Sequence, residues 1–353
     1  MDSKIKIYLK IALINLFCFF IFIIIFELIF GYWFEKYNFG PYMREHRMKN
    51  IPYKLTYNNT DYKYNYVRNS LAFRGEEIKP KDIKILMVGG STTDERYKPE
   101  RFTIVGNLNK KFLKAGSSRK IINAGIEGQS TRGHIYNFNF WFKKIENFKP
   151  KYIIFYVGIN DASLLRFKSD NLQDGFIENP NKLESFFDNI KSRSFIIDLA
   201  RKVKHQHYKR DESKRVIYDF DYSLKESKKK DRVYINYENK IKKYDFDKLV
   251  KKHQILIEQY LKNIDLLNTL SNSIGSEAIF INQPMQENET AEILFSINNS
   301  LIVHCEKKKY KCIDLVKNLN GFNDFWWDGA HTTPKGSKAI ADIIYPYLNK
   351  YLN

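Results

Sequence analysis

A serine, a histidine and an aspartate stand where they could act together. Ser91 follows two glycines in the stretch GGSTT, and glycine lets the backbone turn tightly while leaving space beside the hydroxyl. Asp328 and His331 are three residues apart in WWDGAH. At this spacing a carboxylate can bind the imidazole Nδ1 and leave Nε2 free for a serine. These residue types indicate nucleophilic attack by serine on an acyl group.

The glycines and histidines fit a phosphate site or a metal site less well. A phosphate-binding loop needs GxxxxGKS or GxxxxGKT, and a dinucleotide-binding turn needs GxGxxG; neither spacing occurs here. A plain turn at the end of a strand stays an alternative for Ser91 taken alone. The sequence has no HExxH and no paired CxxC, and HQH at His205–His207 lies in a charged stretch typical of solvated surface. We therefore expect neither a metal nor a cofactor.

The elements that must position these residues form an alternating series. Five apolar runs, most of them bounded by glycine, suit strands buried on both faces, and helical patterns separate them. This alternation predicts a parallel sheet with sites at the carboxyl ends of its strands. The predicted strands are Ile83–Gly90, Lys120–Gly125, Lys151–Gly158, Glu277–Pro284 and Lys311–Val316, and the closing helix runs from Pro334 to about Leu352.

Polar or small residues follow these strands in the blocks GGST, NAGIEG and GIND, and DGAH precedes the last helix. The four blocks, in this order, resemble those of the SGNH (GDSL-like) hydrolase family of esterases, lipases and carbohydrate deacetylases. The resemblance implies that Ser91 is the nucleophile, with Asp328 and His331 as acid and base. It also implies an oxyanion hole formed by the N–H groups of Ser91 and Gly128 and the side-chain amide of Asn160.

The resemblance extends from Ile83 to the C-terminus, apart from an insertion at 163–244. The predicted fold is α/β, a flavodoxin-like three-layer sandwich with a five-stranded parallel sheet. One position departs from the family: Gly90 stands where GDS would place an aspartate. Since that aspartate takes no part in the chemistry, its absence weakens the motif more than the expected activity.

The function implied is hydrolysis of esters, O-acetyl or other acyl groups, on cell-surface carbohydrate or a small ester. Two alternatives stay open. The same residues could transfer an acyl group to a sugar hydroxyl on surface polysaccharide, which would make the chain an O-acyltransferase. The catalytic set could also be idle in a domain that binds glycan or a partner protein.

An apolar run of about 24 residues, Ile11–Phe34, contains one acidic residue, Glu27, and is long enough to cross a bilayer. It exceeds the apolar region of a cleaved signal peptide, and Tyr32 and Trp33 supply interfacial aromatics. We expect a single-pass anchor with a cytoplasmic N-terminus, although lysines and arginines flank both ends. The catalytic part would then be extracytoplasmic, on the periplasmic or cell-surface side.

The net charge is +19, from 59 Lys and Arg against 40 Asp and Glu. Such a charge could attract nucleic acid, an acidic glycan or an anionic membrane. The basic residues are scattered and no nucleic-acid motif accompanies them, so we interpret them as solvated surface and expect no nucleic-acid partner. The sequence does not indicate an oligomeric state.

The predicted organisation has three parts: a cytoplasmic tail and anchor at 1–36, a connecting segment without regular structure at 37–80, and a hydrolase domain at 81–353. The insertion in that domain is either a solvated loop or a lid over the site. Cys305 and Cys312 could form a disulfide in an oxidising compartment or remain two buried thiols.

Overall fold

A computed structural model describes residues 3–39, 51–164, 182–208, 218–221, 235–287, 290–320 and 324–352. The chain divides into two compact units. One combines Met1–Glu45 with Asn179–Arg215, and the other combines His46–Glu178 with Val216–Asn353. The second unit contains every predicted site residue.

The core of the second unit is a five-stranded sheet in which every neighbouring pair is parallel. Its order is β4-β3-β5-β7-β8, which is the flavodoxin-like order 2-1-3-4-5 of doubly wound folds. The prediction of an α/β flavodoxin-like sandwich is therefore confirmed. The strands are β3 (Ile85–Gly89), β4 (Ile121–Gly125), β5 (Tyr152–Val157), β7 (Glu277–Asn282) and β8 (Lys311–Ile313).

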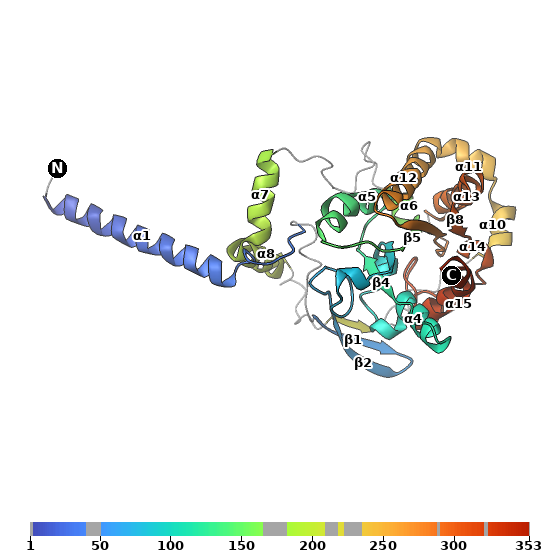
Figure 1. Ribbon diagram of the computed structural model, residues 1–353, viewed down its shortest axis with the longest axis horizontal. Coiled ribbons are helices and arrows are strands. Elements are labelled where there is room, and N and C mark those ends of the chain that lie inside the picture. Colours follow the sequence, from blue (N-terminus) through green and yellow to red (C-terminus); the bar gives the residue numbers. More distant parts are fainter. Residues whose placement is uncertain are drawn as a thin grey trace. The chain divides into compact units, whose positions relative to one another are not determined.

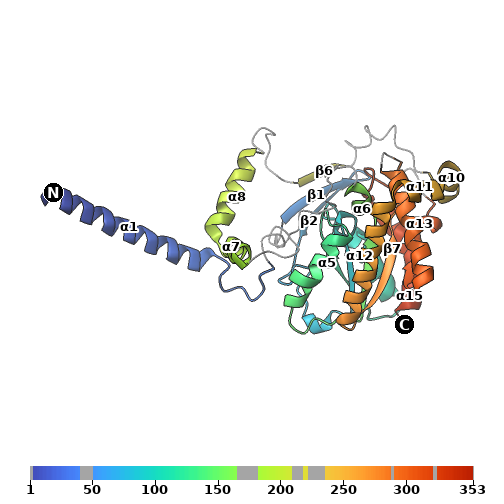
Figure 2. The same ribbon diagram turned by 90° about the horizontal axis from the view of Figure 1, so that it is seen from above.

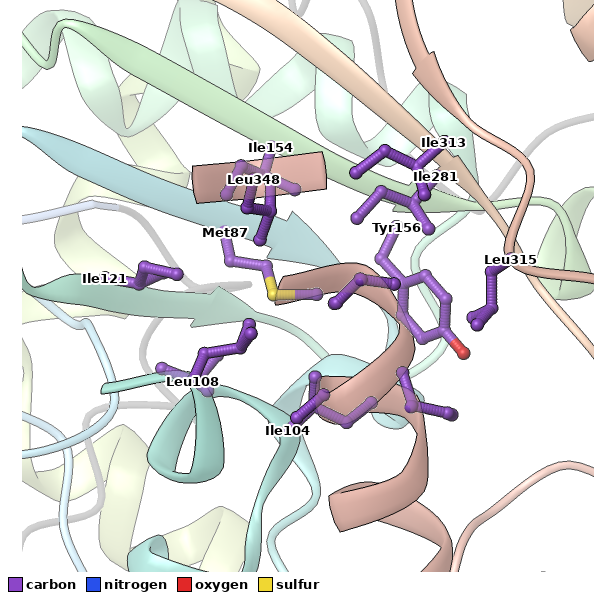
Figure 3. Packing of buried hydrophobic residues seen from close by; sticks show 14 of the residues in the cluster. Met87, Ile104, Leu108, Ile121, Ile154, Tyr156, Ile281, Ile313, Leu315 and Leu348 are labelled. Carbon is purple, nitrogen blue, oxygen red and sulfur yellow. The ribbon is translucent and has the colours of Figure 1, made fainter. Parts of the chain in front are cut away.

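Helices cover both faces of this sheet (Figure 1). Side chains on alternate strand positions, such as Met87, Ile154 and Ile281, pack against Leu108 and Leu348 from the helices of one face (Figure 3). The remaining positions face the other layer, where Phe155 stacks on Phe280. The first face carries α4 (Ile104–Lys114) and α15 (Pro334–Tyr351), and the second carries α5 (Thr131–Phe140), α12 (Gln254–Ser273) and α13 (Ala291–Lys308).

Short helices connect the main elements. A break at His253 separates α11 from α12, and α5 ends at Phe140. The short helices are α3 (Ser91–Asp94), α6 (Ile159–Leu164), α10 (Tyr237–Lys243), α11 (Phe246–Lys252) and α14 (Leu315–Asn318). A disulfide joins Cys305, in α13, to Cys312, in β8.

The prediction that residues 37–80 lack regular structure is wrong for 51–66. This stretch forms an antiparallel hairpin of β1 (Ile51–Tyr57) and β2 (Thr60–Tyr66), and β6 (Tyr218–Asp221) pairs parallel to β1. Asn58 and Asn59, between the strands, both have positive φ, of 49° and 57°. A two-residue turn of this kind matches the twist of a hairpin, and asparagine tolerates it well.

The first unit consists of α1 (Ser3–Phe30), α7 (Lys182–Arg193) and α8 (Phe195–Tyr208). Within Ile5–Phe30 the most apolar 18 residues have a mean hydropathy of 2.8, and none of their side chains is buried. Length and composition fit a membrane anchor or a signal sequence. Thus part of the predicted insertion belongs with the N-terminal helix. Its stretches 165–181, 209–217 and 222–234 lie outside the described residues.

Candidate active site

The nucleophile candidate lies where β3 meets α3. Gly90 caps the helix and Ser91 is its first residue, so the N–H of Ser91 belongs to the helical turn whose donors have no partner within the helix. The Ser91 side chain is half-buried. A serine at this position presents both its hydroxyl and its backbone N–H at the carboxyl end of the sheet.

The base and acid candidates reach Ser91 from the loop before α15. His331 Nε2 lies 2.7 Å from Ser91 Oγ, and His331 Nδ1 lies 2.8 Å from Asp328 Oδ2. Backbone bonds close the loop, because the N–H of Trp327 donates to the carbonyl of His331 at 3.0 Å. The structure therefore joins the three residues in the order expected of a nucleophile, its base and an orienting acid.

The second oxygen of Asp328 fixes the carboxylate in place. Oδ1 accepts the backbone N–H groups of Ala330 at 2.8 Å and His331 at 2.7 Å. Burial alone would raise the pKa of Asp328, but the bond from the imidazole, the charge of His331 and the two N–H bonds outweigh it and leave the pKa lowered. The acid is thus an ionised acceptor, which holds the Nδ1 proton in place and leaves the Nε2 lone pair toward Ser91.

Trp327 adds a contact that the sequence analysis did not assign. Its ring stacks on the imidazole of His331, with centroids 5.0 Å apart and planes inclined by 21°. The indole also meets Tyr97 edge to face, with ring centroids 5.9 Å apart. The imidazole is therefore held by Asp328 at one edge and by an aromatic ring on one face.

The two further oxyanion candidates lie beside each other. Asn160, in α6, donates from Nδ2 to the carbonyl of Gln129 at 2.7 Å, and Gln129 directly follows Gly128. Gly128 has a φ of +77°, a conformation that glycine adopts readily and other residues rarely do. The turn after β4 and the start of α6 are thus joined at the edge where α3 begins.

The surroundings of Gly90 leave little room for a side chain. A Cβ built at this position would come within 2.3 Å of Asn160 Nδ2 and 3.3 Å of the Gln129 carbonyl. The amide of Asn160 therefore packs against the bare backbone just before Ser91. In this chain the glycine at the position of the GDS aspartate is thus in contact with a candidate oxyanion donor, which the sequence alone did not indicate.

Gln283 is a residue that the sequence analysis missed. It follows β7 directly, and its side chain donates to Thr92 Oγ1 at 2.8 Å and accepts the N–H of Ile159 at 2.8 Å. It thereby ties the helix of Ser91 to the helix of Asn160. The signal was present, because Gln283 occupies the same place after its strand as the candidate residues occupy after theirs.

Asp94, which had no expected role, lies at the centre of a buried polar cluster under α3. Its Oδ1 accepts from Arg68 Nη2 at 2.8 Å and from the Tyr66 hydroxyl at 2.8 Å. Burial raises the pKa of Asp94, but Arg68, Arg74 and Arg96 lower it by more. An ionised Asp94 thus connects the helix that begins at Ser91 to β2 and the segment that follows β2.

A second buried pair connects the segment after Ser91 to the loop of His331. Lys98 Nζ donates to Glu95 Oε1 at 2.5 Å and to the carbonyl of Thr332, the neighbour of His331, at 2.6 Å. Ser337 Oγ also donates to Glu95, at 2.6 Å. Burial lowers the pKa of Lys98, against the attraction of Glu95. Among the described residues, no three His, Cys, Asp or Glu side chains cluster as a metal site would require.

The sequence matches the model of the GDSL-like lipase/acylhydrolase family over residues 85–344. No curated protein matches the chain. Similar solved structures include TesA, which is 10% identical; the match covers 76% of this chain and 98% of TesA, with a TM-score of 0.44. The esterase EstA from Pseudoalteromonas sp. is 15% identical, with 77% and 100% covered and a TM-score of 0.43. A catalytic mutant of an acetylxylan esterase from Geobacillus stearothermophilus is 12% identical, with 77% and 96% covered and a TM-score of 0.42.

The matched residues 85–344 begin with the strand before Ser91 and end within α15, beyond Asp328 and His331. They therefore include the whole central sheet and every candidate site residue. The chain belongs to the GDSL-like lipase/acylhydrolase family and is an ester-acting hydrolase.

Proposed function

We propose that this protein is a membrane-anchored serine esterase that removes acyl groups, such as O-acetyl, from carbohydrate outside the cytoplasm. The observation that carries the proposal is the continuous hydrogen-bonded series from Ser91 to His331 to Asp328, with separations of 2.7 and 2.8 Å. These separations are within reach for proton transfer from the nucleophile to its base.

In the proposed mechanism, His331 Nε2 takes the hydroxyl proton as Ser91 Oγ attacks the ester carbonyl carbon. The carbonyl oxygen becomes an oxyanion that the N–H groups of Ser91 and Gly128 and the Asn160 amide stabilise. His331 then gives its proton to the alcohol oxygen, and the carbon–oxygen bond of the ester breaks. Water attacks the acyl-serine with the same base, which releases the acid and restores the Ser91 hydroxyl.

The bonding of Asn160 is compatible with this role. A side-chain amide has two N–H donors, and the Gln129 carbonyl at 2.7 Å uses one of them. The other is available to an oxyanion, and the first bond holds the amide in a fixed orientation. Such preorganised donors stabilise developing charge without having to rearrange during the reaction.

Two features support a location outside the cytoplasm. Among the described residues, α1 is the one helix that is long and apolar enough to cross a membrane, and it lies near the N-terminus, as in a signal anchor followed by a large domain. The Cys305–Cys312 disulfide supports an oxidising compartment, since cytosolic proteins rarely keep such bonds. A domain tethered there meets surface polysaccharide, which is why we propose an acylated carbohydrate as substrate.

Three measurements test the proposal. A fluorophosphonate probe should label the full-length protein in detergent, and Ser91→Ala should abolish labelling while Ser163→Ala, in the nearby helix α6, should not. The wild type should hydrolyse p-nitrophenyl acetate and release acetate from an acetylated polysaccharide. Folded wild-type protein that neither reacts with the probe nor cleaves either ester would overturn the proposal.

Location is tested separately, with C-terminal reporter fusions in a bacterial host. Alkaline phosphatase, which needs disulfides, should be active on this terminus, and a green fluorescent protein that folds in the cytoplasm should be dark. The opposite pair of results would place the catalytic domain in the cytoplasm and remove the argument for surface carbohydrate.

A further inference from the structure

The N-terminal unit contains two exposed apolar surfaces besides α1, and they lie on α7 and α8. On α7 the exposed side chains are Leu183, Phe186 and Phe187, at 65%, 58% and 48% exposure. On α8 they are Ile196, Leu199 and Val203, at 38%, 46% and 56% exposure. Both sets follow the three- and four-residue spacing that gathers side chains on one face of a helix.

The beginning of α8 is fastened to the end of α1. Glu27, the one acid of the apolar run, accepts the N–H groups of Phe195 and Ile196, each at 2.9 Å, and the Ser194 hydroxyl at 2.6 Å. It also accepts from Trp33 Nε1 at 3.1 Å. An acidic side chain that receives the first N–H groups of a helix satisfies donors that otherwise have no partner.

Aromatic and backbone contacts reinforce this connection. Phe195 packs against Phe26 at 5.5 Å and Phe30 at 5.7 Å between ring centroids. Arg193, the last residue of α7, donates to the Trp33 carbonyl at 2.7 Å. In both views α8 lies at the C-terminal end of α1 (Figure 1 and Figure 2). The corner between α7 and α8 is therefore held at the end of the apolar helix.

If α1 crosses a membrane, these contacts set the depth in the bilayer at which the junction of α7 and α8 lies. Glu27 is three residues from the end of α1, or about 4.5 Å along a helix, so the first turn of α8 lies near the edge of the hydrocarbon. Trp33, the partner of Glu27, is a residue type that prefers this interface. Helices held at this depth with an exposed apolar face can bury it among lipid acyl chains.

The charge of the two helices fits the same environment. Residues 182–208 contain six Lys and Arg against three Asp and Glu. Helices that lie in a membrane interface combine an apolar face with an excess of basic residues, which favours anionic lipid headgroups.

We propose that α7 and α8 form a second membrane contact, which lies in the interface of the bilayer that α1 spans, with the face of Phe187 and Leu199 turned to lipid. The occupant of this surface is the lipid itself, because the surface is continuous with the end of the membrane helix. Part of the inserted segment between Asn160 and β7 thus binds the membrane surface. The proposal concerns the anchor and goes beyond the proposed activity.

The test places a fluorophore on each surface of the full-length protein in liposomes of phosphatidylcholine and phosphatidylglycerol. In a Cys18→Ser background the introduced cysteine is the one free thiol, since Cys305 and Cys312 are bridged. The variants are Phe187→Cys and Leu199→Cys, labelled with NBD. The control is Leu113→Cys, because Leu113 is also an exposed apolar side chain, at 75% exposure, and lies in the catalytic unit.

At positions 187 and 199 we expect a blue-shifted emission and loss of most of the fluorescence when the lipid carries a spin label near its headgroup. The label at 113 should show neither effect. An emission at 187 and 199 like that at 113 would overturn the proposal. A blue shift that spin-labelled lipid does not quench would also overturn it, because protein rather than lipid would then cover the helices.

A second measurement avoids the hydrophobic dye. In the same liposomes, hydrogen exchange over α7 and α8 should be faster in the Phe187→Ser, Leu199→Ser double variant than in the wild type, with α4 unchanged as an internal control. Equal protection in both proteins would contradict the proposal. Hydrolysis of p-nitrophenyl acetate should be the same in both proteins. The membrane contact can therefore be refuted without refuting the proposed activity, and the activity can be refuted without refuting the membrane contact.

Discussion

Replacing Asp328 by asparagine tests the proposed base in a specific way, because it keeps the shape of the side chain and changes its donors. Asp328 Oδ1 accepts two backbone N–H groups, from Ala330 at 2.8 Å and His331 at 2.7 Å. The asparagine oxygen must take this position, since an NH₂ group there would face two donors. The new NH₂ group then occupies the place of Oδ2, next to the imidazole.

That arrangement reverses the histidine tautomer. Nδ1 of His331 lies 2.8 Å from the position of Oδ2, and it can meet an NH₂ group at this distance only as an acceptor. The proton then moves to Nε2, which lies 2.7 Å from Ser91 Oγ, so the nitrogen that should accept the serine proton already carries one. The same change in serine proteases lowers kcat by about 10⁴, or about 5.4 kcal/mol at about 1.36 kcal/mol per tenfold.

We therefore expect kcat on p-nitrophenyl acetate to fall by about 10³- to 10⁴-fold in Asp328→Asn. The melting temperature should change little, since both backbone N–H groups keep an acceptor. Asp328→Ala imposes no tautomer, so it should retain as much activity as Asp328→Asn or more, although it leaves two N–H groups without this acceptor and should be less stable. Asp324→Asn is the matched control, because that carboxylate accepts from the Tyr57 hydroxyl and not from His331. A folded Asp328→Asn protein within tenfold of wild-type activity would refute the reasoning.

Three further predictions concern residues around the site. Gly90→Ala should lower kcat by about 10²- to 10³-fold, because its Cβ would displace the Asn160 amide, the proposed oxyanion donor; steady-state kinetics measure this effect. Gln283→Ala should destabilise the protein by about 1–3 kcal/mol in urea unfolding and lower kcat, since it removes the acceptor of the buried Ile159 N–H. Burial lowers the pKa of His134 to about 3 from 6.5, so the folded state resists protonation and the wild type should lose up to about 1.4 kcal/mol of stability per pH unit below pH 6.5. Thermal melts of His134→Leu should show a flatter dependence between pH 6.5 and 4.

Controls and contrary results differ among the three. Gly90 has a φ of −85°, which alanine adopts without strain, so a loss of fold would exclude the proposed cause. Adding Asn160→Ala to Gly90→Ala should cost little more, and fully additive losses would argue against a shared mechanism. Gln254→Ala, at an exposed glutamine that bonds Glu258, should leave stability unchanged. An unchanged pH slope in His134→Leu would show that other groups dominate acid unfolding.

The central sheet could be predicted because its physical signal is local. A strand buried on both faces must be apolar throughout, and Ile153 and Phe155 face one layer while Ile154 and Tyr156 face the other. The polar residues that interrupt such runs then mark the carboxyl ends of the strands. Ser91 and Asn160 were found in this way, and Gln283 could have been found by the same rule.

The hairpin of β1 and β2 was missed because its pattern is weaker. Tyrosines at Tyr62, Tyr64 and Tyr66 alternate with polar residues, and the turn is Asn58–Asn59 rather than the more familiar Asn-Gly. The apolar faces of α7 and α8 were missed for a different reason. Charged residues surround them, and their partner in our proposal is a bilayer, which a search for a protein core does not consider.

The position of the base depends on interactions that no local pattern indicates. Ser91 and Asn160 stand at the ends of adjacent central strands, so the sheet itself sets their separation. His331 has no such support, because the helix α14 separates its loop from β8, which is itself an edge strand of three residues. The loop is connected to the segment after Ser91 instead through the buried pair of Lys98 and Glu95: Lys98 donates to the carbonyl of Thr332, and Glu95 accepts from its hydroxyl. In the sequence these two residues look like ordinary surface charges. A buried pair that loses one partner leaves an uncompensated charge, so this connection positions the base and at the same time makes the site depend on both residues.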